Sequence, residues 1–254
     1  VFLINKMDRE NASFDNTVTA IQSTFGDQCV PFQLPVGEAE TFSDVVSVIF
    51  PPSVIPDEIS TEFELARERL IEAVAEADDE LADKYLETGE LSDSEVLSGA
   101  RSAILKGDLV PILAASATQN IGVQQFLEMV REFMPSPVDG EKPIMSGVGS
   151  DKELDFEIDS TEPLAAFVFK TTADPFVGKL SVFRVYRGTI NSNSEVWNSA
   201  KNQSERIGQL YLPKGKSQEN INEVTAGDIG AIGKLASTVT GDSLCDKDYQ
   251  VSFP

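Results

Sequence analysis

Hydrophobic and polar residues follow two different periods along the chain. In the first half, apolar residues recur at steps of three and four or their multiples, which predicts an amphipathic helix along Phe63, Leu70, Val74, Ala77, Leu81 and Tyr85. Beyond residue 150, short β-branched and aromatic runs alternate with turn signals, as in a sandwich or barrel. The predicted strands are Leu164–Phe169, Leu180–Tyr186, Ser194–Trp197, Ser204–Leu212 and Ile229–Ile232.

Two apolar runs in the first half predict buried strands, at Val1–Ile4 and Val110–Leu113. Gly122–Met134 predicts an amphipathic helix after the second run, with five residues facing inward: Val123, Phe126, Leu127, Val130 and Phe133. A strand, a loop and a helix, twice over, indicate the second half of a nucleotide-binding α/β domain.

Local signals mark helix ends and a domain junction. Thr61-x-x-Glu64 and Ser92-x-x-Glu95 each predict a capping box at a helix start, and Gly107 predicts the end of the second helix. The stretch 136–143 combines proline, glycine and charge, which is typical of a linker.

Charge is unevenly distributed. The 254 residues include 20 Lys and Arg and 42 Asp and Glu, a net charge of −22, which argues against a general coat for DNA or RNA. Asp57–Glu95 holds 15 acidic and three basic residues, whereas Pro163–Lys247 holds eight acidic and ten basic residues. The acidic run is either a solvated helix face or a patch that docks a basic partner protein.

Composition excludes several chemistries. There is no histidine, so Ser-His-Asp and Cys-His catalysis and His-ligated metal sites are excluded, and we assign neither a catalytic nor a metal-binding residue. Two distant cysteines, Cys29 and Cys245, form no disulfide framework and fit a reducing compartment. No apolar run reaches the ~18 residues of a membrane span.

The motif Asn5-Lys6-Met7-Asp8 directly follows the first predicted strand and resembles N-K-x-D, the guanine-reading motif of GTPases. An ionised carboxylate at Asp8 can accept two hydrogen bonds, from N1–H and the N2 amine of guanine, and adenine offers no such pair. The aliphatic stem of Lys6 can cover one face of the base, and Asn5 can bridge the base edge and neighbouring loops. The alternative is a polar turn between strand and helix.

A second loop follows the other predicted strand. Ala114-Ala115-Ser116-Ala117 comes after Val110–Leu113, and its Ser-Ala pair is similar to the last GTPase motif, in which a backbone N–H contacts guanine O6. Ligands bind at the carboxyl ends of strands in open α/β sheets, so both loops are expected at one site.

Six ordered blocks carry a resemblance that runs almost end to end. The chain resembles translation elongation factor G in INKMDRENASF, PFQLPVGEAETF, LIEAVAEADDELADKYL, SATQNIGVQQFLEMVREFMPSP, FKTTADPFVGKLSVFRVYRGTINS and AGDIGAIGKL with TGDSLCD. The resemblance implies an α/β fold, the latter part of a P-loop-type GTPase domain over 1–137 with an α+β insert at about 26–108. A linker at 138–152 and an all-β barrel domain at 153–254 would follow.

The resemblance also implies site residues and partners. The guanine base would be contacted by Asn5, Lys6, Asp8, Ser116 and Ala117. The intact protein would be a GTPase that binds GTP or GDP with Mg²⁺ and couples GTP hydrolysis to translocation of tRNA and mRNA in the cytoplasm. The acidic insert would meet a ribosomal stalk protein. The barrel would contact small-subunit RNA through a basic face, for which the candidates are Lys201, Arg206, Lys214 and Lys216; ordinary surface charge is the alternative. No membrane or DNA partner is expected.

Two expected motifs do not occur in the sequence. Neither G-x-x-x-x-G-K-[ST] nor D-x-x-G is found, so the phosphate-gripping and magnesium-sensing loops are missing. We therefore expect a half-site that binds no nucleotide tightly and hydrolyses no GTP. The start at Val1 in mid-strand favours a fragment of a longer chain with an exposed sheet edge, over a trimmed or disordered start. Open alternatives are a ribosomal protection or recycling paralogue and a stand-alone, non-enzymatic ribosome-docking module.

Overall fold

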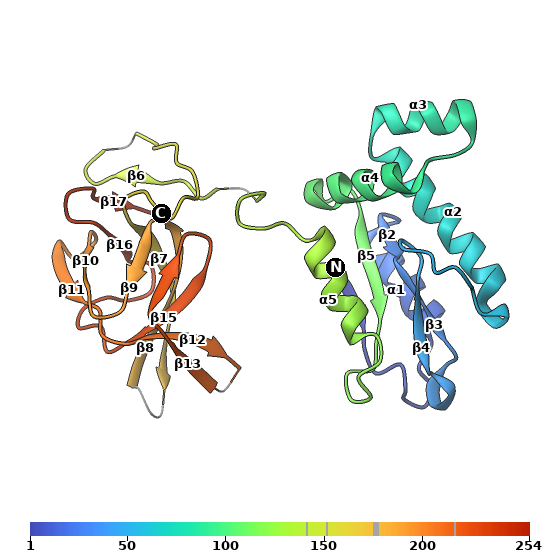
Figure 1. Cartoon of the computed structure of the whole chain (residues 1–254), viewed down its shortest axis with the longest axis horizontal. Helices are drawn as coiled ribbons and strands as arrows, with labels where there is room; N and C mark the ends of the chain where they lie inside the picture. Colours follow the sequence, from blue (N-terminus) through green and yellow to red (C-terminus); the bar gives the residue numbers. More distant parts are fainter. Residues whose placement is uncertain (141, 151, 175–177, 216) are drawn as a thin grey trace. The chain divides into compact units, whose positions relative to one another are not determined.

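The chain forms two compact units, Val1–Pro135 and Ser136–Pro254, in a computed structural model (Figure 1). The structure describes residues 1–140, 142–150, 152–174, 178–215 and 217–254. The two units are described separately below.

A three-stranded parallel sheet organises unit 1. Its order is β1 (Phe2–Ile4), β5 (Val110–Ala114) and β2 (Cys29–Pro31), with Phe2 opposite Ile112 and Cys29 opposite Val110. β5 is buried in the centre, as expected for a parallel strand. The prediction that Val1–Ile4 is a buried strand is only half right, because Leu3 is 39% exposed. β1 lies at the edge of this sheet, where only one neighbour covers it.

Two helices and a hairpin complete the region around the sheet. α1 (Phe14–Phe25) follows β1, and α5 (Val123–Phe133) follows β5. The hairpin pairs β3 (Gln33–Val36) with β4 (Asp44–Ser47) in antiparallel register, and the short helix η1 (Ala39–Thr41) lies in its turn.

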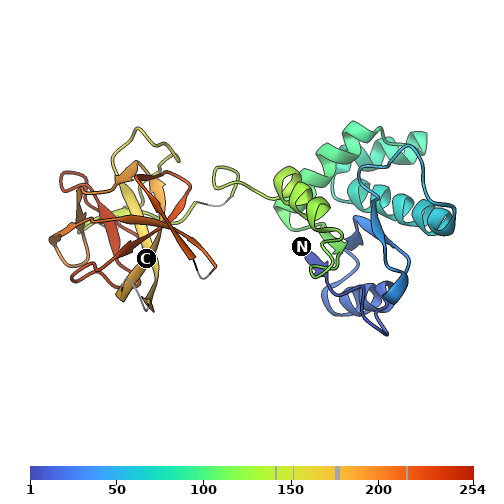
Figure 2. The same ribbon diagram turned by 60° about the horizontal axis from the view of Figure 1, so that its bottom comes forward.

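Three consecutive helices pack together in unit 1 and share its hydrophobic core with the sheet (Figures 1 and 2). They are α2 (Ser60–Glu76), α3 (Asp79–Thr88) and α4 (Asp93–Lys106). The single apolar stripe predicted from Phe63 to Tyr85 therefore spans two helices. Asp78 begins the second one, because its side chain accepts hydrogen bonds from the N–H groups of Glu80 and Leu81.

The predicted caps have mixed outcomes. The Ser92–Glu95 capping box is present and Gly107 ends α4 in the left-handed conformation, so both predictions are confirmed. The Thr61–Glu64 capping box is wrong. The short helix η2 (Asp57–Ile59) runs directly into α2, whose N-cap is Ile59 and carries no side-chain cap.

The buried face of α5 is also rotated from the prediction. Met129 and Phe133 are buried, whereas Leu127 is 55% and Val130 is 37% exposed. Phe133 packs against the rings of Phe32 and Phe50, so the hairpin side of the unit determines which face of α5 is covered.

Unit 2 is built from strands, and its described residues contain no helix. An eight-stranded sheet curls around a core in the order β11-β10-β16-β7-β8-β15-β12-β13 (Figures 1 and 2). Its strands are β7 (Ala165–Asp174), β8 (Gly178–Arg187), β10 (Glu195–Asn198), β11 (Gln203–Arg206), β12 (Leu210–Lys214), β13 (Ser217–Ile221), β15 (Ile229–Gly233) and β16 (Ser243–Cys245).

Two small sheets and two apolar clusters complete unit 2. β9 (Thr189–Asn191) pairs with β14 (Glu223–Thr225), and β6 (Ser146–Gly147) pairs with β17 (Val251–Ser252). The main cluster fills the curled sheet, and Trp197 packs beside a smaller cluster with Met145, Phe156 and Phe253, which favours a core role. The run Ser204–Leu212, predicted as one strand, forms two because the chain leaves the sheet between β11 and β12.

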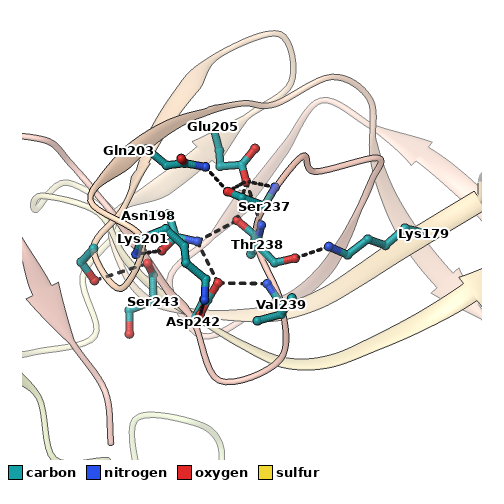
Figure 3. A network of polar contacts seen from close by, with 11 residues as sticks. Lys179, Asn198, Lys201, Gln203, Glu205, Ser237, Thr238, Val239, Asp242 and Ser243 are labelled. Carbon is teal, nitrogen blue, oxygen red and sulfur yellow. Dashed lines mark hydrogen bonds and ion pairs between the residues drawn. The ribbon is translucent and has the colours of Figure 1, made fainter.

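A hydrogen-bonded polar network lies inside unit 2 (Figure 3). Glu205 is 3% exposed and accepts bonds from the backbone N–H groups of Ala236, Ser237 and Thr238 at 2.8–3.0 Å and from the Ser237 and Thr238 hydroxyls. Burial raises the pKa of Glu205, but these five bonds outweigh it and lower the pKa to about 2. The carboxylate is therefore ionised, buried and fully partnered.

The network continues through a buried amide. Asn198 donates from Nδ2 to Thr238 Oγ1 and Asp242 Oδ2, both at 2.9 Å. Asp242 Oδ2 also accepts from the Val239 N–H at 2.9 Å, and Lys179 Nζ donates to the Thr238 carbonyl. These bonds fix the segment after β15 against β10 and β11.

Candidate functional site

Two loops meet at the carboxyl end of the parallel sheet in unit 1. Since β1 and β5 are parallel neighbours, the segments that follow them, beginning at Asn5 and Ala115, leave the same edge. The backbone joins them: Ala115 N–H donates to the Ile4 carbonyl at 2.9 Å, and Met7 N–H donates to the Ala115 carbonyl at 3.2 Å. The sheet thus brings together residues that lie far apart in the sequence.

Asn5 links the two loops through its side chain. Its Oδ1 accepts from the Lys6 N–H at 2.8 Å and from the Ala117 N–H at 3.0 Å. Lys6 has φ 68°, a left-handed conformation that is uncommon outside glycine, and this bend follows directly on Asn5. In this geometry the Ala117 N–H, expected to face guanine O6, is bonded to Asn5.

Ser116 anchors the second loop. It is fully buried, and its backbone exchanges two 3.0 Å hydrogen bonds with Ile121, which closes a tight turn. Its hydroxyl accepts from the Gln119 N–H at 3.2 Å. Gly122 ends the turn with φ +76°, and a Cβ there would lie 2.4 Å from the Ala114 carbonyl oxygen, so the turn requires glycine.

Asp8 carries an unpartnered oxygen at this site. Its Oδ1 is buried and makes no hydrogen bond to any described residue. The Ser116 side chain is the chief cause that lowers the pKa of the Asp8 carboxyl; burial opposes it, and the Asp8 backbone N–H, Arg9 and the Gln119 side chain lower it further. The group is therefore ionised, with free acceptor capacity beside the loops.

The unpartnered acceptor of Asp8 is chemically compatible with a guanine base. A buried carboxylate oxygen without a partner costs free energy, and a ligand with adjacent N–H donors would satisfy it. Guanine presents N1–H and N2–H on one edge, and the Lys6 side chain is exposed next to Asp8. Among the residues that the structure describes, no group of three His, Cys, Asp or Glu could hold a metal ion.

The sequence missed one contributor to the site. Gln119 lies three residues after Ser116 in the tight turn, where its backbone N–H bonds the Ser116 hydroxyl and its side chain lowers the pKa of Asp8. In the sequence, the only indication of this role was the position of Gln119 shortly after the Ser-Ala pair.

The predicted basic residues lie in unit 2. Lys201 follows β10, Arg206 ends β11 and Lys214 ends β12, and all three are exposed. Lys214 pairs with Glu219, and Lys201 Nζ lies 4.0 Å from Asp242 Oδ1, so part of this charge is neutralised locally. Lys216 lies outside the described residues. In the described part of the chain, no helix is long and apolar enough to span a bilayer.

Comparisons with known proteins agree with this architecture. A model described as the elongation factor Tu GTP binding domain matches residues 1–136, and a model described as elongation factor G domain 2 matches residues 163–247. The chain is also similar to a crystal structure of a protein from Thermus thermophilus, with a TM-score of 0.75 and 25% sequence identity. That match covers 96% of this chain and 35% of the Thermus chain.

These matches confirm the expected resemblance and the expected fold class, a GTPase domain with a parallel sheet followed by a β-rich domain. The first family model alone covers more than half of the chain. The chain therefore belongs to the translational GTPases, the family of elongation factors Tu and G.

Proposed function

We propose that this chain recognises the guanine base of GTP and GDP through Asn5, Lys6, Asp8, Ser116 and Ala117, within an elongation-factor-G-like protein that promotes translocation of tRNA and mRNA. The observation that carries the proposal is the buried Asp8 Oδ1, which has no partner among the described residues beside a loop that Asn5 holds in place. An acceptor of that kind selects a base edge with two N–H donors and rejects adenine.

In this chain we propose residues that contact the base but none that contact the phosphates. When bound, the nucleotide would supply the γ-phosphate for hydrolysis, with Mg²⁺ at its phosphates. No residue here is assigned to the phosphates or Mg²⁺, because the sequence contains neither G-x-x-x-x-G-K-[ST] nor D-x-x-G. We therefore propose that the chain alone binds guanine nucleotides weakly and does not hydrolyse GTP.

The elongation factor G match in unit 2 supports action at the ribosome rather than another GTPase role. We propose that the segment at about 26–108 is an inserted subdomain whose acidic helices dock a basic surface of a ribosomal stalk protein. The acidic side chains along α2 and α3 are largely exposed, and Leu65 and Leu86 are exposed beside them at 54% and 84%. Lys201, Arg206 and Lys214 remain the candidates for ribosomal RNA, together with Lys216.

A calorimetric titration of the chain with GDP tests the proposal, with ADP as the matched nucleotide and Asp8→Ala as the matched protein. We expect GDP to bind with a Kd of roughly 1 mM or weaker, about −4 kcal/mol, and ADP and the variant to give no binding. Phosphate release from GTP should equal the buffer rate. Micromolar binding of GDP, or equal binding of ADP, would overturn the proposal.

A further inference from the structure

One cavity in unit 1 is lined by none of the residues proposed to contact guanine. Its volume is ≈ 230 Å³, and it lies between the β3–β4 hairpin, the segment after β4, and α5. Its floor consists of Phe32, Ile49, Leu113 and Met129, which are all buried. Phe50 forms one wall and is 43% exposed, although its ring packs 5.8 Å from that of Phe133.

Gln33 carries an unpartnered polar atom and belongs to the lining of the cavity, whose other polar residues are Ser47, Gln125 and Glu128. The residue lines the cavity and is 3% exposed, and its Oε1 is buried without a hydrogen-bond partner among the described residues. Ser47 lies directly opposite on β4 and also lines the cavity, but its hydroxyl accepts from the Phe50 N–H at 3.0 Å. Buried amide oxygens are almost always bonded, so this one is suited to a ligand that brings a donor.

The lining of the cavity contains one carboxylate, on its solvent-exposed side. Glu128 on α5 lines the cavity and is exposed, and one of its oxygens accepts from Gln124 Nε2 at 3.0 Å. Unit 1 as a whole carries 25 acidic and 8 basic residues, a net charge of −17, which favours a cationic ligand over a neutral or anionic one.

Size restricts the ligand further. A cavity of about 150 Å³ lined by Leu, Ile and Phe holds one benzene ring, so ≈ 230 Å³ accommodates a fused two-ring aromatic. Small-molecule sites combine apolar side chains with placed polar groups, and this cavity has five apolar and four polar residues in its lining. An indole has the required size and one N–H donor.

We propose that this cavity binds a small cationic arylalkylamine of the indole class. The ring lies on the floor beside Phe50, its N–H donates to Gln33 Oε1, and the ammonium group faces Glu128 at the mouth. Leu113 belongs to β5, the strand that leads into the Ser116 loop, so the ligand would sit in the same unit as the base-recognition loops but at a different site.

The test is a titration of the ¹⁵N-labelled chain with tryptamine, followed by NMR. We expect the largest shifts at Gln33, Ser47, Phe50 and Met129, with saturation at or below about 1 mM. N1-methyltryptamine, which lacks the ring N–H, should bind about tenfold more weakly, and neutral indole should also bind more weakly. Shifts centred elsewhere, or no saturation by ~5 mM, would overturn the proposal.

Variants separate the two polar contacts. Gln33→Leu should weaken tryptamine about tenfold and leave N1-methyltryptamine unchanged, because only the first ligand uses the amide oxygen. Glu128→Gln should reduce tryptamine to the affinity of indole. Glu62→Gln on α2, which removes a carboxylate away from this cavity, should bind tryptamine as the parent does. Equal losses for both ligands in Gln33→Leu would contradict the assigned bond.

Discussion

Asp8 in unit 1 and Glu205 in unit 2 are carboxylates with lowered pKa values and opposite surroundings. Glu205 accepts hydrogen bonds from five protein donors, four of which belong to Ser237 and Thr238 (Figure 3) and one to Ala236. Asp8 has Ser116 as its chief partner and keeps one buried oxygen unpaired among the described residues. The contrast separates a carboxylate that stabilises the fold from one that we propose binds a ligand.

A carboxylate with a lowered pKa can either stabilise the fold or bind a ligand, and the direction of the pKa shift does not distinguish these two roles. The roles differ in whether the chain itself supplies the hydrogen-bond donors. Removal of Glu205 should leave three backbone N–H groups, the buried one of Thr238 and the part-buried ones of Ala236 and Ser237, without an acceptor. Removal of Asp8 leaves no described group that depends on its Oδ1. The experiments below test that difference, in order of decreasing effect on stability.

The largest effect is expected for Glu205→Ala, at about 3–5 kcal/mol of destabilisation of unit 2, because three backbone N–H groups lose their acceptor. Urea unfolding monitored by Trp197 fluorescence, from the single tryptophan, reports on this unit. Glu195→Ala on neighbouring β10 is the control and should change stability by less than about 0.5 kcal/mol. Similar losses in both variants would remove the special role of Glu205.

Acid should weaken unit 2 through the same group. The pKa of Glu205 is about 2 in the folded chain and 4.5 in the reference state, so its stabilisation is complete above pH ~4.5 and is lost as the pH falls through 2. The shift corresponds to about 3 kcal/mol. The stability gap between the parent chain and Glu205→Gln should therefore shrink as the pH falls from about 5 to about 2, measured by urea unfolding at each pH. A constant gap would contradict the assignment.

Gly122→Ala should destabilise unit 1 by about 2–3 kcal/mol, because a Cβ would lie 2.4 Å from the Ala114 carbonyl oxygen at φ +76°. Gly89→Ala is a matched control: its φ is +75°, but no atom lies within 4 Å of the added Cβ. Thermal unfolding followed by circular dichroism should show the larger loss for Gly122, and the difference measures the clash alone. Equal losses would mean that the turn after Ser116 can relax.

Asn5→Ala should cost about 1–2 kcal/mol locally, because the Lys6 and Ala117 N–H groups lose their shared acceptor. Amide hydrogen exchange is the direct measurement, and the Ala117 amide should exchange about tenfold faster or more. Asn16→Ala on the exposed start of α1 should leave that amide unchanged. Unaltered exchange at Ala117 in Asn5→Ala would show that the two loops are held by the backbone alone.

Asp8→Asn should have the smallest effect on stability, within about 1 kcal/mol of the parent, because its Oδ1 serves no described group of the chain. Urea unfolding of unit 1 followed by circular dichroism would show it. A loss of stability as large as that expected for Glu205→Ala would show that Asp8 also stabilises the fold, and would contradict the difference between the two carboxylates.

The sequence predicted the parts of the fold that depend on local pattern. The Ser92 capping box, the Gly107 helix end and the strand before Ser116 follow from short-range rules and are observed. The incorrect predictions concern features that depend on tertiary packing or on a local cap. The face of α5 is determined by Phe133 packing on Phe32 and Phe50, and the apolar stripe from Phe63 to Tyr85 is interrupted by the Asp78 cap, which no periodicity reveals.

The candidate site shows the same division. The sequence alone indicates the motif that begins at Asn5 and the Ser-Ala pair, because both follow apolar runs that predict strands. The bond from Ala117 to Asn5 crosses 112 positions, and the unpaired Asp8 oxygen is a property of three-dimensional packing. The Glu205 network had no sequence signal, since its donors are mostly backbone N–H groups of a loop 31–33 residues away.

The most direct test of the central claim is a comparison of guanosine, inosine and adenosine binding to the ¹⁵N-labelled chain by NMR. If Asp8 reads N1–H and N2–H, guanosine should shift the Asp8, Ser116 and Ala117 amides at millimolar concentration. Inosine, which lacks the N2 amine, should bind several-fold more weakly, and adenosine should leave these amides unmoved. Equal shifts with adenosine, or guanosine shifts that persist in Asp8→Ala, would contradict the account.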